Sequence, residues 1–166
     1  MKEKYFELDD TNYLVKSAVV AALYAVLTLL LPVASYGPIQ FRFSEILVLL
    51  VFYNKRFIPG LILGCAIANL FSPMMLFDVA FGTLSSYIAF RLMQKAKNLY
   101  LASIFPVLLV IVPAIGTWLI LANNEVLLIM IMQFMLSEFI MVSIIGVMIF
   151  KILEKNEGFM SYINNF

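Results

Sequence analysis

The sequence has no histidine, a single cysteine and few charged residues. Histidine is the commonest metal ligand and proton carrier in proteins, so its absence removes the usual candidate for either role. Cys65 cannot form a disulfide within the chain, and its apolar stretch predicts a buried, inert thiol. The sequence also lacks a GxxxxGK(S/T) motif, an HExxH motif and a Ser/His/Asp set. We therefore expect no catalytic residues, no metal site and no cofactor.

Apolar residues dominate what is present. Hydrophobic residues make up 64% of the 166 positions and charged residues 13%, far from the composition of soluble proteins, which predicts an integral membrane protein. The net charge of +1 gives no electrostatic reason to expect nucleic acid as a partner. The apolar run that begins at Leu14 is too long for a secretory signal, so we interpret it as a retained span.

The apolar runs predict one all-α membrane domain over residues 1–166, with six transmembrane helices. The predicted spans are residues 14–31, 44–53, 57–71, 75–92, 100–121 and 126–153. A helix of about 18 residues is roughly 27 Å long, close to the thickness of a bilayer core. The second span is short, which favours a tilted or partly extended crossing. Residues 32–43 predict an ordered outer loop rather than a helix, and a polar tail follows Leu153.

The basic residues orient these spans. Ten of the eleven fall on one side of the membrane in the six-span arrangement: Lys2, Lys4, Lys16, Lys55, Arg56, Arg91, Lys95, Lys97, Lys151 and Lys155. The positive-inside rule makes that side, with both termini, cytoplasmic and leaves Arg42 at the outer face. A single crossing over residues 44–71 would leave five spans, but it would bury Lys55 and Arg56 in lipid at a high free-energy cost.

A small set of polar residues lies outside the cytoplasmic clusters. Its members are Gln40, Arg42, Glu45, Asn69, Asp78, Trp118, Gln133 and Glu138. Glu138 is the most informative, because a carboxylate deep in the sixth span needs a partner or a wet cavity, which indicates a ligand or ion role; structural pairing to another span is the alternative. Arg42 and Glu45, three residues apart, could instead pair with each other. Asp78 would equally suit a helix N-terminus.

Small residues form a smooth flank on the first span. Ala18 and Ala22 are four residues apart, as are Ala21 and Ala25. Smooth surfaces let helices approach closely in lipid, and spacing alone favours packing within the chain. A similar ridge, Gly60, Gly64 and Ala68, lies on the third span.

Three segments carry a family resemblance. They are YGPIQFRFSEILVLLVFY at residues 36–53, PGLILGCAIANLFSP at 59–73 and FDVAFGTLSSYIA at 77–89. In this order and spacing they resemble the QueT family, whose members are substrate-binding S components of energy-coupling factor (ECF) transporters. The resemblance is strong over about the first 95 residues and compatible with the later spans.

The resemblance implies a multi-pass protein of the bacterial cell membrane that captures a vitamin-like ligand from outside. Such a subunit associates with a transmembrane coupling subunit and two cytoplasmic ATPases, which supply the energy. S components of this kind carry an AxxxA motif on the first helix that docks the coupling subunit. Ala18, Ala21, Ala22 and Ala25 match that motif.

The resemblance also implies a ligand, because the family is associated with the queuosine precursors preQ0, preQ1 and queuine. The donor edge of such a deazapurine suits a carboxylate, for which Glu138 is the first candidate. The ring would stack on Trp118 or Tyr36, and a cationic amine would meet Glu45 or Asp78. Asn69, Gln40 and Arg42 would complete the polar contacts.

Other functions stay open on the sequence alone. Pocket side chains rather than the fold select a ligand, so an S component for another vitamin or heterocycle is one alternative. A solitary ion-coupled carrier would use Glu138 and Asp78 as its coupling acids. A purely structural membrane subunit would bind no small molecule.

Overall fold

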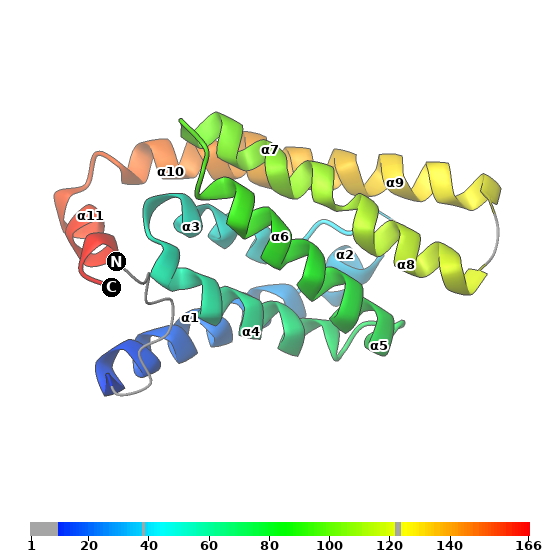
Figure 1. The fold of residues 1–166 in the computed structure, drawn as a ribbon, viewed down its shortest axis with the longest axis horizontal. Coiled ribbons are helices and arrows are strands. Elements are labelled where there is room, and N and C mark those ends of the chain that lie inside the picture. Colours follow the sequence, from blue (N-terminus) through cyan, green and yellow to red (C-terminus); the bar gives the residue numbers. More distant parts are fainter. Residues whose placement is uncertain (1–9, 38, 122–123) are drawn as a thin grey trace.

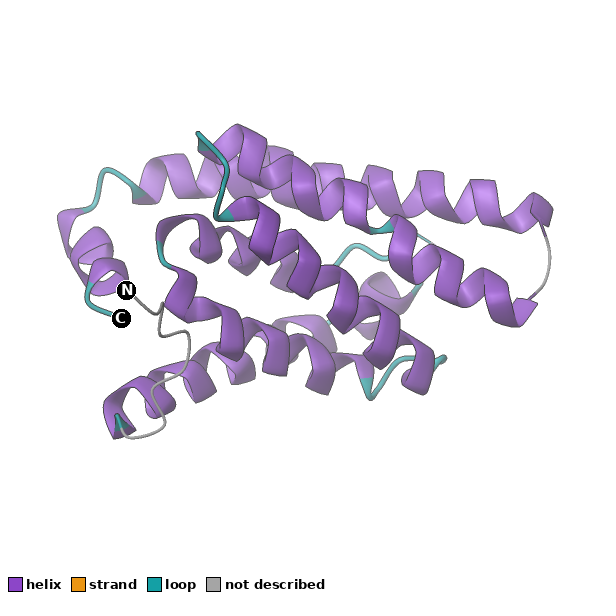
Figure 2. Ribbon diagram, viewed as in Figure 1, coloured by secondary structure: helices purple, strands orange, loops and turns teal. Residues whose placement is uncertain are grey.

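The computed structural model describes residues 10–37, 39–121 and 124–166, and all regular structure in them is helical (Figures 1 and 2). This confirms the all-α prediction. The helices of the first half are α1 (Thr11–Leu29), α2 (Pro32–Tyr36), η1 (Phe43–Leu49), α3 (Leu50–Tyr53), η2 (Lys55–Phe57), α4 (Ile58–Asn69) and α5 (Met75–Phe77). Those of the second half are η3 (Asp78–Gly82), α6 (Thr83–Met93), α7 (Leu99–Leu109), α8 (Ile111–Leu121), α9 (Asn124–Glu138), η4 (Phe139–Gly146), α10 (Val147–Leu153) and α11 (Glu157–Asn164).

Four continuous helices of the described chain are long and apolar enough to cross a membrane. They are Thr11–Leu29, Met75–Met93, Leu99–Leu119 and Leu127–Leu153, and Phe43–Tyr53 is a shorter apolar helix. These segments correspond to predicted spans one, four, five, six and two. The third predicted span is represented by α4, which has 12 residues and is about 18 Å long at 1.5 Å per residue.

The second predicted span is neither a plain α-helix nor partly extended. The 3-10 helix η1 begins one residue before the predicted span, ends at Leu49 and continues as one α-helical turn, α3. A 3-10 helix rises about 2.0 Å per residue, so the 3-10 portion reaches farther than an α-helix of equal length would. The larger rise of the 3-10 helix therefore lengthens this short segment, as partial extension would have done.

Two segments outside the predicted spans are helical. Pro32–Tyr36 forms α2, so the prediction of a loop there is wrong for these five residues. Proline at the first helical position is favourable because its missing N–H is not needed there. The polar tail forms α11, capped by the side chain of Asn156, which accepts a hydrogen bond from the Phe159 N–H.

Helix α11 folds back onto the beginning of α1. Phe166, which follows it, is 3% exposed and packs against the ring of Phe57, with 3.9 Å between centroids, and edge-on against Tyr13. Lys16 Nζ donates to the Asn165 carbonyl (3.0 Å). The C-terminus and the first turn of α1 therefore lie at the same end of the helix bundle (Figure 1).

The tightest helix pair is α1 against α4. Gly60 and Gly64 of α4 face α1, where a Cβ at Gly64 would come within 2.8 Å of the Ala21 carbonyl oxygen. Ala21 and Ala25 are buried in the chain, whereas Ala18 and Ala22 are exposed. The alanine flank is thus divided between the core and the outer surface of α1.

Candidate functional site

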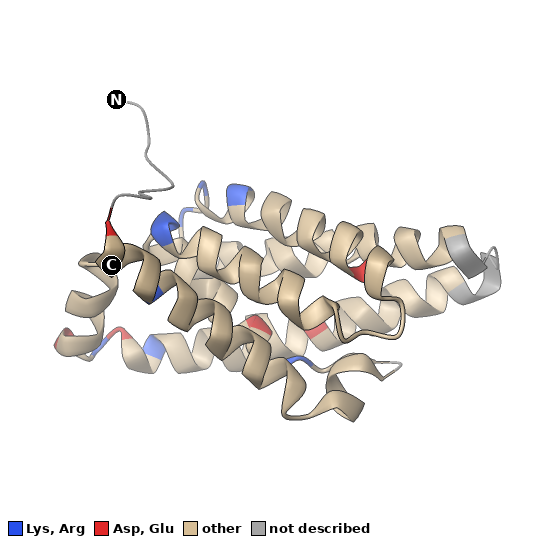
Figure 3. Ribbon diagram, turned by 90° about the horizontal axis from the view of Figure 1, so that it is seen from below, with Lys and Arg blue, Asp and Glu red and all other residues tan. Residues whose placement is uncertain are grey.

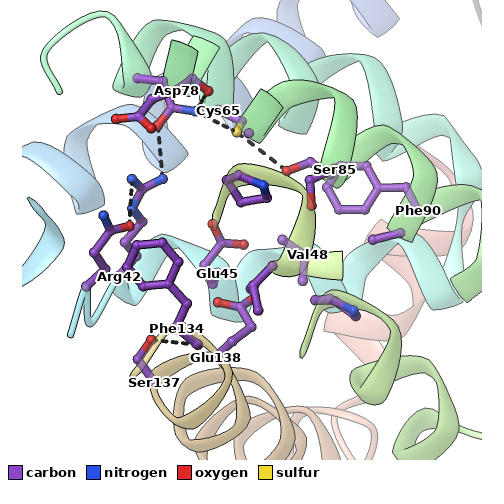
Figure 4. Close-up of a pocket in the computed structure, with 18 residues that line it drawn as sticks. Arg42, Glu45, Val48, Cys65, Asp78, Ser85, Phe90, Phe134, Ser137 and Glu138 are labelled. Carbon is purple, nitrogen blue, oxygen red and sulfur yellow. Dashed lines mark hydrogen bonds between the residues drawn. The ribbon is translucent and has the colours of Figure 1, made fainter. Parts of the chain in front are cut away.

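A cavity of about 80 Å³ lies between η1, α4, η3, α6, α7 and α9 (Figure 4). Six of the eight predicted site residues line it: Gln40, Arg42, Glu45, Asn69, Asp78 and Glu138. They come from segments up to about 100 residues apart in the sequence, so only the packing of the helices brings them together. Tyr36 and Trp118 do not line the cavity.

Three hydrogen bonds hold the Arg42 guanidinium in place. Its Nη1 donates to Asn69 Oδ1 at 2.9 Å, its Nη2 to Gln40 Oε1 at 3.3 Å, and its Nε to the Ser35 carbonyl at 3.2 Å. Cζ also lies 5.5 Å from the centre of the Tyr36 ring. A guanidinium has five N–H donors, so these bonds fix the group and leave donors for a ligand.

Gln40 reaches this arrangement through an unusual backbone conformation. Its φ of +49° lies in the left-handed region, which is disfavoured for residues other than glycine. Its backbone N–H donates to the Gly37 carbonyl at 3.1 Å, which closes the turn before Arg42. Strain of this kind is retained where surrounding contacts dictate it, and here it presents the Gln40 amide oxygen to Arg42.

Asn69 connects Arg42 to the acidic side of the cavity. It is completely buried, and while its oxygen accepts from Arg42, its Nδ2 donates to the Asp78 carbonyl at 3.0 Å. The Asp78 carboxylate in turn accepts a hydrogen bond from the Ser72 hydroxyl. Every polar group of this cluster therefore has a partner within the protein, as buried polar groups require.

The two glutamates of the cavity differ in their partners. Glu45 Oε1 accepts a hydrogen bond of 2.5 Å from the hydroxyl of Tyr24, on α1. Glu138 makes no hydrogen bond and no ion pair with any described residue. Figure 4 shows both side chains reaching into the cavity from different helices. The predicted alternative of an Arg42–Glu45 ion pair is not formed in the described structure.

All three acids sit where the helix geometry departs from the α-helix. Glu45 lies in the 3-10 helix η1, Asp78 begins the π-helix η3, and Glu138 directly precedes the π-helix η4. A π-helical turn inserts a residue and rotates the following side chains, and such turns are frequent at functional sites. Each carboxylate therefore enters the cavity at or directly beside a local distortion of the helix geometry.

The rest of the cavity wall was not predicted from the sequence. It contains the rings of Phe90, Phe134, Pro106 and Pro113, together with Cys65 and small polar residues, Ser85, Ser86 and Ser137. Phe134 precedes Glu138 by four residues, so helical spacing could have placed it on the same face. Nothing in the sequence distinguished the serines. Ser85 is typical, because its hydroxyl donates to the Leu109 carbonyl and links α6 to α7.

This arrangement is suited to binding. One fixed cation and three acids line the cavity, so a ligand with several N–H donors or a positive charge is favoured. The apolar rings offer an apolar surface for a flat, partly apolar body beside the polar groups.

Comparison with known proteins identifies the family. The sequence profile of the QueT transporter family matches residues 14–155. The chain belongs to the QueT transporter family. The resemblance seen in the three sequence segments is thereby confirmed.

One relative is similar over part of its length. The Queuosine precursor transporter QueT of Lactococcus lactis subsp. cremoris (strain MG1363) is 45% identical over 80 residues, which are 47% of this chain and 47% of that protein. The similarity thus spans about half the length of the relative. No solved structure matches the chain. All the residues that line the cavity lie within the segment matched by the QueT family profile.

Proposed function

We propose that this chain is the substrate-binding S component of an ECF-type importer and that it captures a queuosine precursor from the outer face of the bacterial cell membrane. Membership of the QueT transporter family and the name of the Lactococcus relative support the ligand class. The observation that carries the proposal is the cavity in which Arg42, Asn69, Glu45 and Glu138 converge beside apolar rings. The deazapurines preQ0, preQ1 and queuine combine a flat ring with adjacent donors and a carbonyl, which matches that set.

In the proposed pose, Glu138 accepts from the donor edge of the deazapurine. Its carboxylate is the one acid of the cavity that no described residue satisfies, so a ligand can supply the missing donors. The free N–H groups of Arg42 bind the ring carbonyl. Phe134 and Phe90, which line the cavity, pack against the ring in place of Trp118 and Tyr36, which do not.

We further propose six crossings with both termini in the cytoplasm. The Lys and Arg residues of the described chain gather mainly in the half of the molecule that holds the C-terminus (Figure 3). That distribution agrees with the positive-inside rule when this half faces the cytoplasm. In the proposed orientation Arg42 and the cavity would lie toward the outer face, from which the ligand would enter.

The exposed part of the α1 flank is the proposed docking face for the coupling subunit. Ala18 and Ala22 are exposed and alternate with exposed aliphatic residues, among them Val15, Val19 and Val26. Two cytoplasmic ATPases would act through that coupling subunit. Ala21 and Ala25 would contribute indirectly, since they hold α1 against α4.

Calorimetry on the purified chain in detergent tests the binding proposal. Wild type is titrated with preQ0, preQ1, queuine and riboflavin, with folding checked by a cooperative melting transition. We expect one or more deazapurines, and not riboflavin, to bind and raise the melting temperature. Absence of deazapurine binding by folded protein would contradict the proposed ligand.

An uptake assay separates the S component from a solitary ion-coupled carrier, which the unpartnered carboxylate of Glu138 also favours. Cells that express the chain with and without an ECF coupling module are compared for deazapurine accumulation. Uptake that requires the module and ATP supports the S component. Uptake by the chain alone, abolished by dissipating ion gradients, would support the carrier.

A further inference from the structure

Tyr24 lies behind the cavity wall, on the helix that carries the alanine flank. It is 1% exposed, does not line the cavity and has an apolar neighbourhood on α1. Its hydroxyl nevertheless donates the hydrogen bond to Glu45 Oε1 described above. That bond is the one hydrogen bond that the Glu45 side chain makes among the described residues.

A second contact fixes the residue next to Glu45 to the same helix. Ser44 Oγ lies 2.7 Å from Thr28 Oγ1, and both side chains are fully buried. Thr28 donates its hydroxyl proton to the Tyr24 carbonyl at 3.0 Å, so Ser44 is the donor to Thr28. Ser35 Oγ makes a third hydrogen bond to α1, because it donates to the Thr28 carbonyl at 2.7 Å.

These hydrogen bonds between α1 and the segment around Glu45 restrain Glu45 before a ligand binds, whereas Glu138 is not restrained in this way. The hydrogen bond of Ser44 fixes the backbone beside Glu45, and Tyr24 donates to one of the two carboxylate oxygens of Glu45. The other oxygen is therefore available to a ligand in the cavity. Glu138 has neither restraint. Preorganised acceptors bind a ligand more tightly, because the cost of ordering them has already been met during folding.

We propose that Tyr24 is a positioning residue of the ligand site, which holds Glu45 in a single orientation and thereby sets how tightly the cavity takes its ligand. The proposal rests on the proposed function as a binding subunit. It adds a residue that touches no ligand and that the α1 helix supplies from outside the cavity. Removal of the Tyr24 hydroxyl leaves a half-buried carboxylate without its donor and free to turn away from the ligand.

Substitution of Tyr24 by phenylalanine keeps the ring and its packing while removing that hydroxyl. Tyr13→Phe is a matched control, because Tyr13 lies on the same helix, is also buried (2% exposed) and donates its hydroxyl to the Arg56 carbonyl, remote from the cavity. We expect Tyr24→Phe to weaken binding of the tightest deazapurine by about tenfold, the effect of one hydrogen bond to a charged group. Tyr13→Phe should leave the affinity within about twofold, although both variants lower the melting temperature.

A double-mutant cycle with Glu45→Ala distinguishes positioning from general loss of packing, because alanine leaves the Tyr24 hydroxyl no acceptor at position 45. If Tyr24 acts through Glu45, its hydroxyl no longer matters once that side chain is gone, so Tyr24→Phe should change the affinity of Glu45→Ala by less than about twofold. An equal loss of affinity in the two backgrounds would overturn the proposal. The proposal would also be overturned if Tyr13→Phe and Tyr24→Phe lowered the ligand affinity equally.

Infrared difference spectroscopy provides a readout that needs no ligand. The carboxylate stretching band assigned to Glu45 by subtraction of Glu45→Gln should shift in Tyr24→Phe and stay unchanged in Tyr13→Phe. If wild type binds no deazapurine, the proposed function fails and this band decides the positioning role by itself. A Glu45 band that is identical in wild type and Tyr24→Phe would refute the role, whatever the ligand.

Discussion

Gly82 lies directly against the side-chain amide of Asn69: a Cβ at position 82 would come within 2.8 Å of Asn69 Nδ2. Asn69 is the buried residue that joins Arg42 to the Asp78 backbone. The absence of a side chain at Gly82 is therefore a condition for the polar cluster of the cavity, since η3 otherwise could not approach α4 this closely.

Gly82→Ala is expected to weaken ligand binding by about tenfold or more, because displacing the amide of Asn69 breaks hydrogen bonds on both of its sides. The measurement is calorimetric titration with the tightest deazapurine. Gly158→Ala is the control, since Gly158 is exposed in the first turn of α11 and its nearest neighbour is the Asn156 side chain at 3.3 Å. Unchanged affinity in Gly82→Ala would show that the cluster is not required for binding.

Asn69→Ala tests the same cluster from its centre. The change removes the acceptor of Arg42 Nη1 and the side-chain donor to the Asp78 carbonyl, so we expect a loss of about 1–3 kcal/mol in stability together with weaker binding. Thermal denaturation and titration measure the two effects. Asn98→Ala, which removes the cap of α7, should cost about 1 kcal/mol and leave the affinity intact. Matching affinities for the two variants would count against a role of Asn69 in the site.

The parts of the fold that could be predicted are those determined by composition and charge. Apolar runs separated by Lys and Arg gave the helical segments closely, because transfer of residues into lipid depends mainly on the residue and little on its neighbours. The same logic identified six of the polar residues that line the cavity, although not its serines, since a polar group in an apolar span needs a specific reason to be there.

The rest depends on packing, which leaves little trace in one sequence. The π-helices beside Asp78 and Glu138 and the 3-10 helix of Glu45 are local distortions that tertiary contacts select. Tyr24 reads as one more apolar residue of α1 until the structure places Glu45 beside it. Trp118 was chosen for its ring alone, and the ring lies outside the cavity.

Gly64→Ala is predicted to destabilise the contact between α1 and α4. The new Cβ would come within 2.8 Å of both the Ala21 carbonyl oxygen and Tyr24 Cβ, and backbone of α1 cannot yield as a flexible side chain would. Overpacking of this kind costs about 1–3 kcal/mol, and displacement of Tyr24 should also weaken ligand binding. Melting curves in detergent measure the loss. Leu63→Ala, on the exposed side of α4, should lower the melting temperature far less.

The end of the molecule where the C-terminus lies should show a pH-dependent stability. Lys151 Nζ donates to Glu154 Oε2 at 2.9 Å and Tyr53 Oη to Oε1 at 2.8 Å, and these bonds, chiefly that from Lys151, lower the pKa of Glu154. A carboxyl with a lowered pKa in the folded state contributes stability above its unfolded pKa of about 4.3, and loses it as pH falls through the folded value.

Glu154→Gln should therefore be less stable than wild type at pH 7, by about 1 kcal/mol or less for a partly exposed pair, and equal to it at the lowest pH. Melting temperatures of both proteins between about pH 3 and 7 test this. A difference that stays constant across the range would mean that the charge of Glu154 does not contribute.

Glu138→Gln should separate the effect of this intramembrane acid on the stability of the protein from its effect on ligand affinity. The substitution keeps the shape of the side chain, removes its charge and replaces one acceptor oxygen by a donor. Because Glu138 has no hydrogen-bond partner among the described residues, the free protein should lose no stability and gain some. Ligand affinity should fall by about tenfold to a hundredfold, since an amide nitrogen opposes the donors that the carboxylate would accept. Glu45→Gln is the informative comparison, because it replaces the charged acceptor of the bond from Tyr24 by a weaker neutral one and should lower both stability and affinity. If Glu138→Gln binds as tightly as wild type, Glu138 is not the acceptor of the donor edge, and Glu45, already held by Tyr24, would have to take that role.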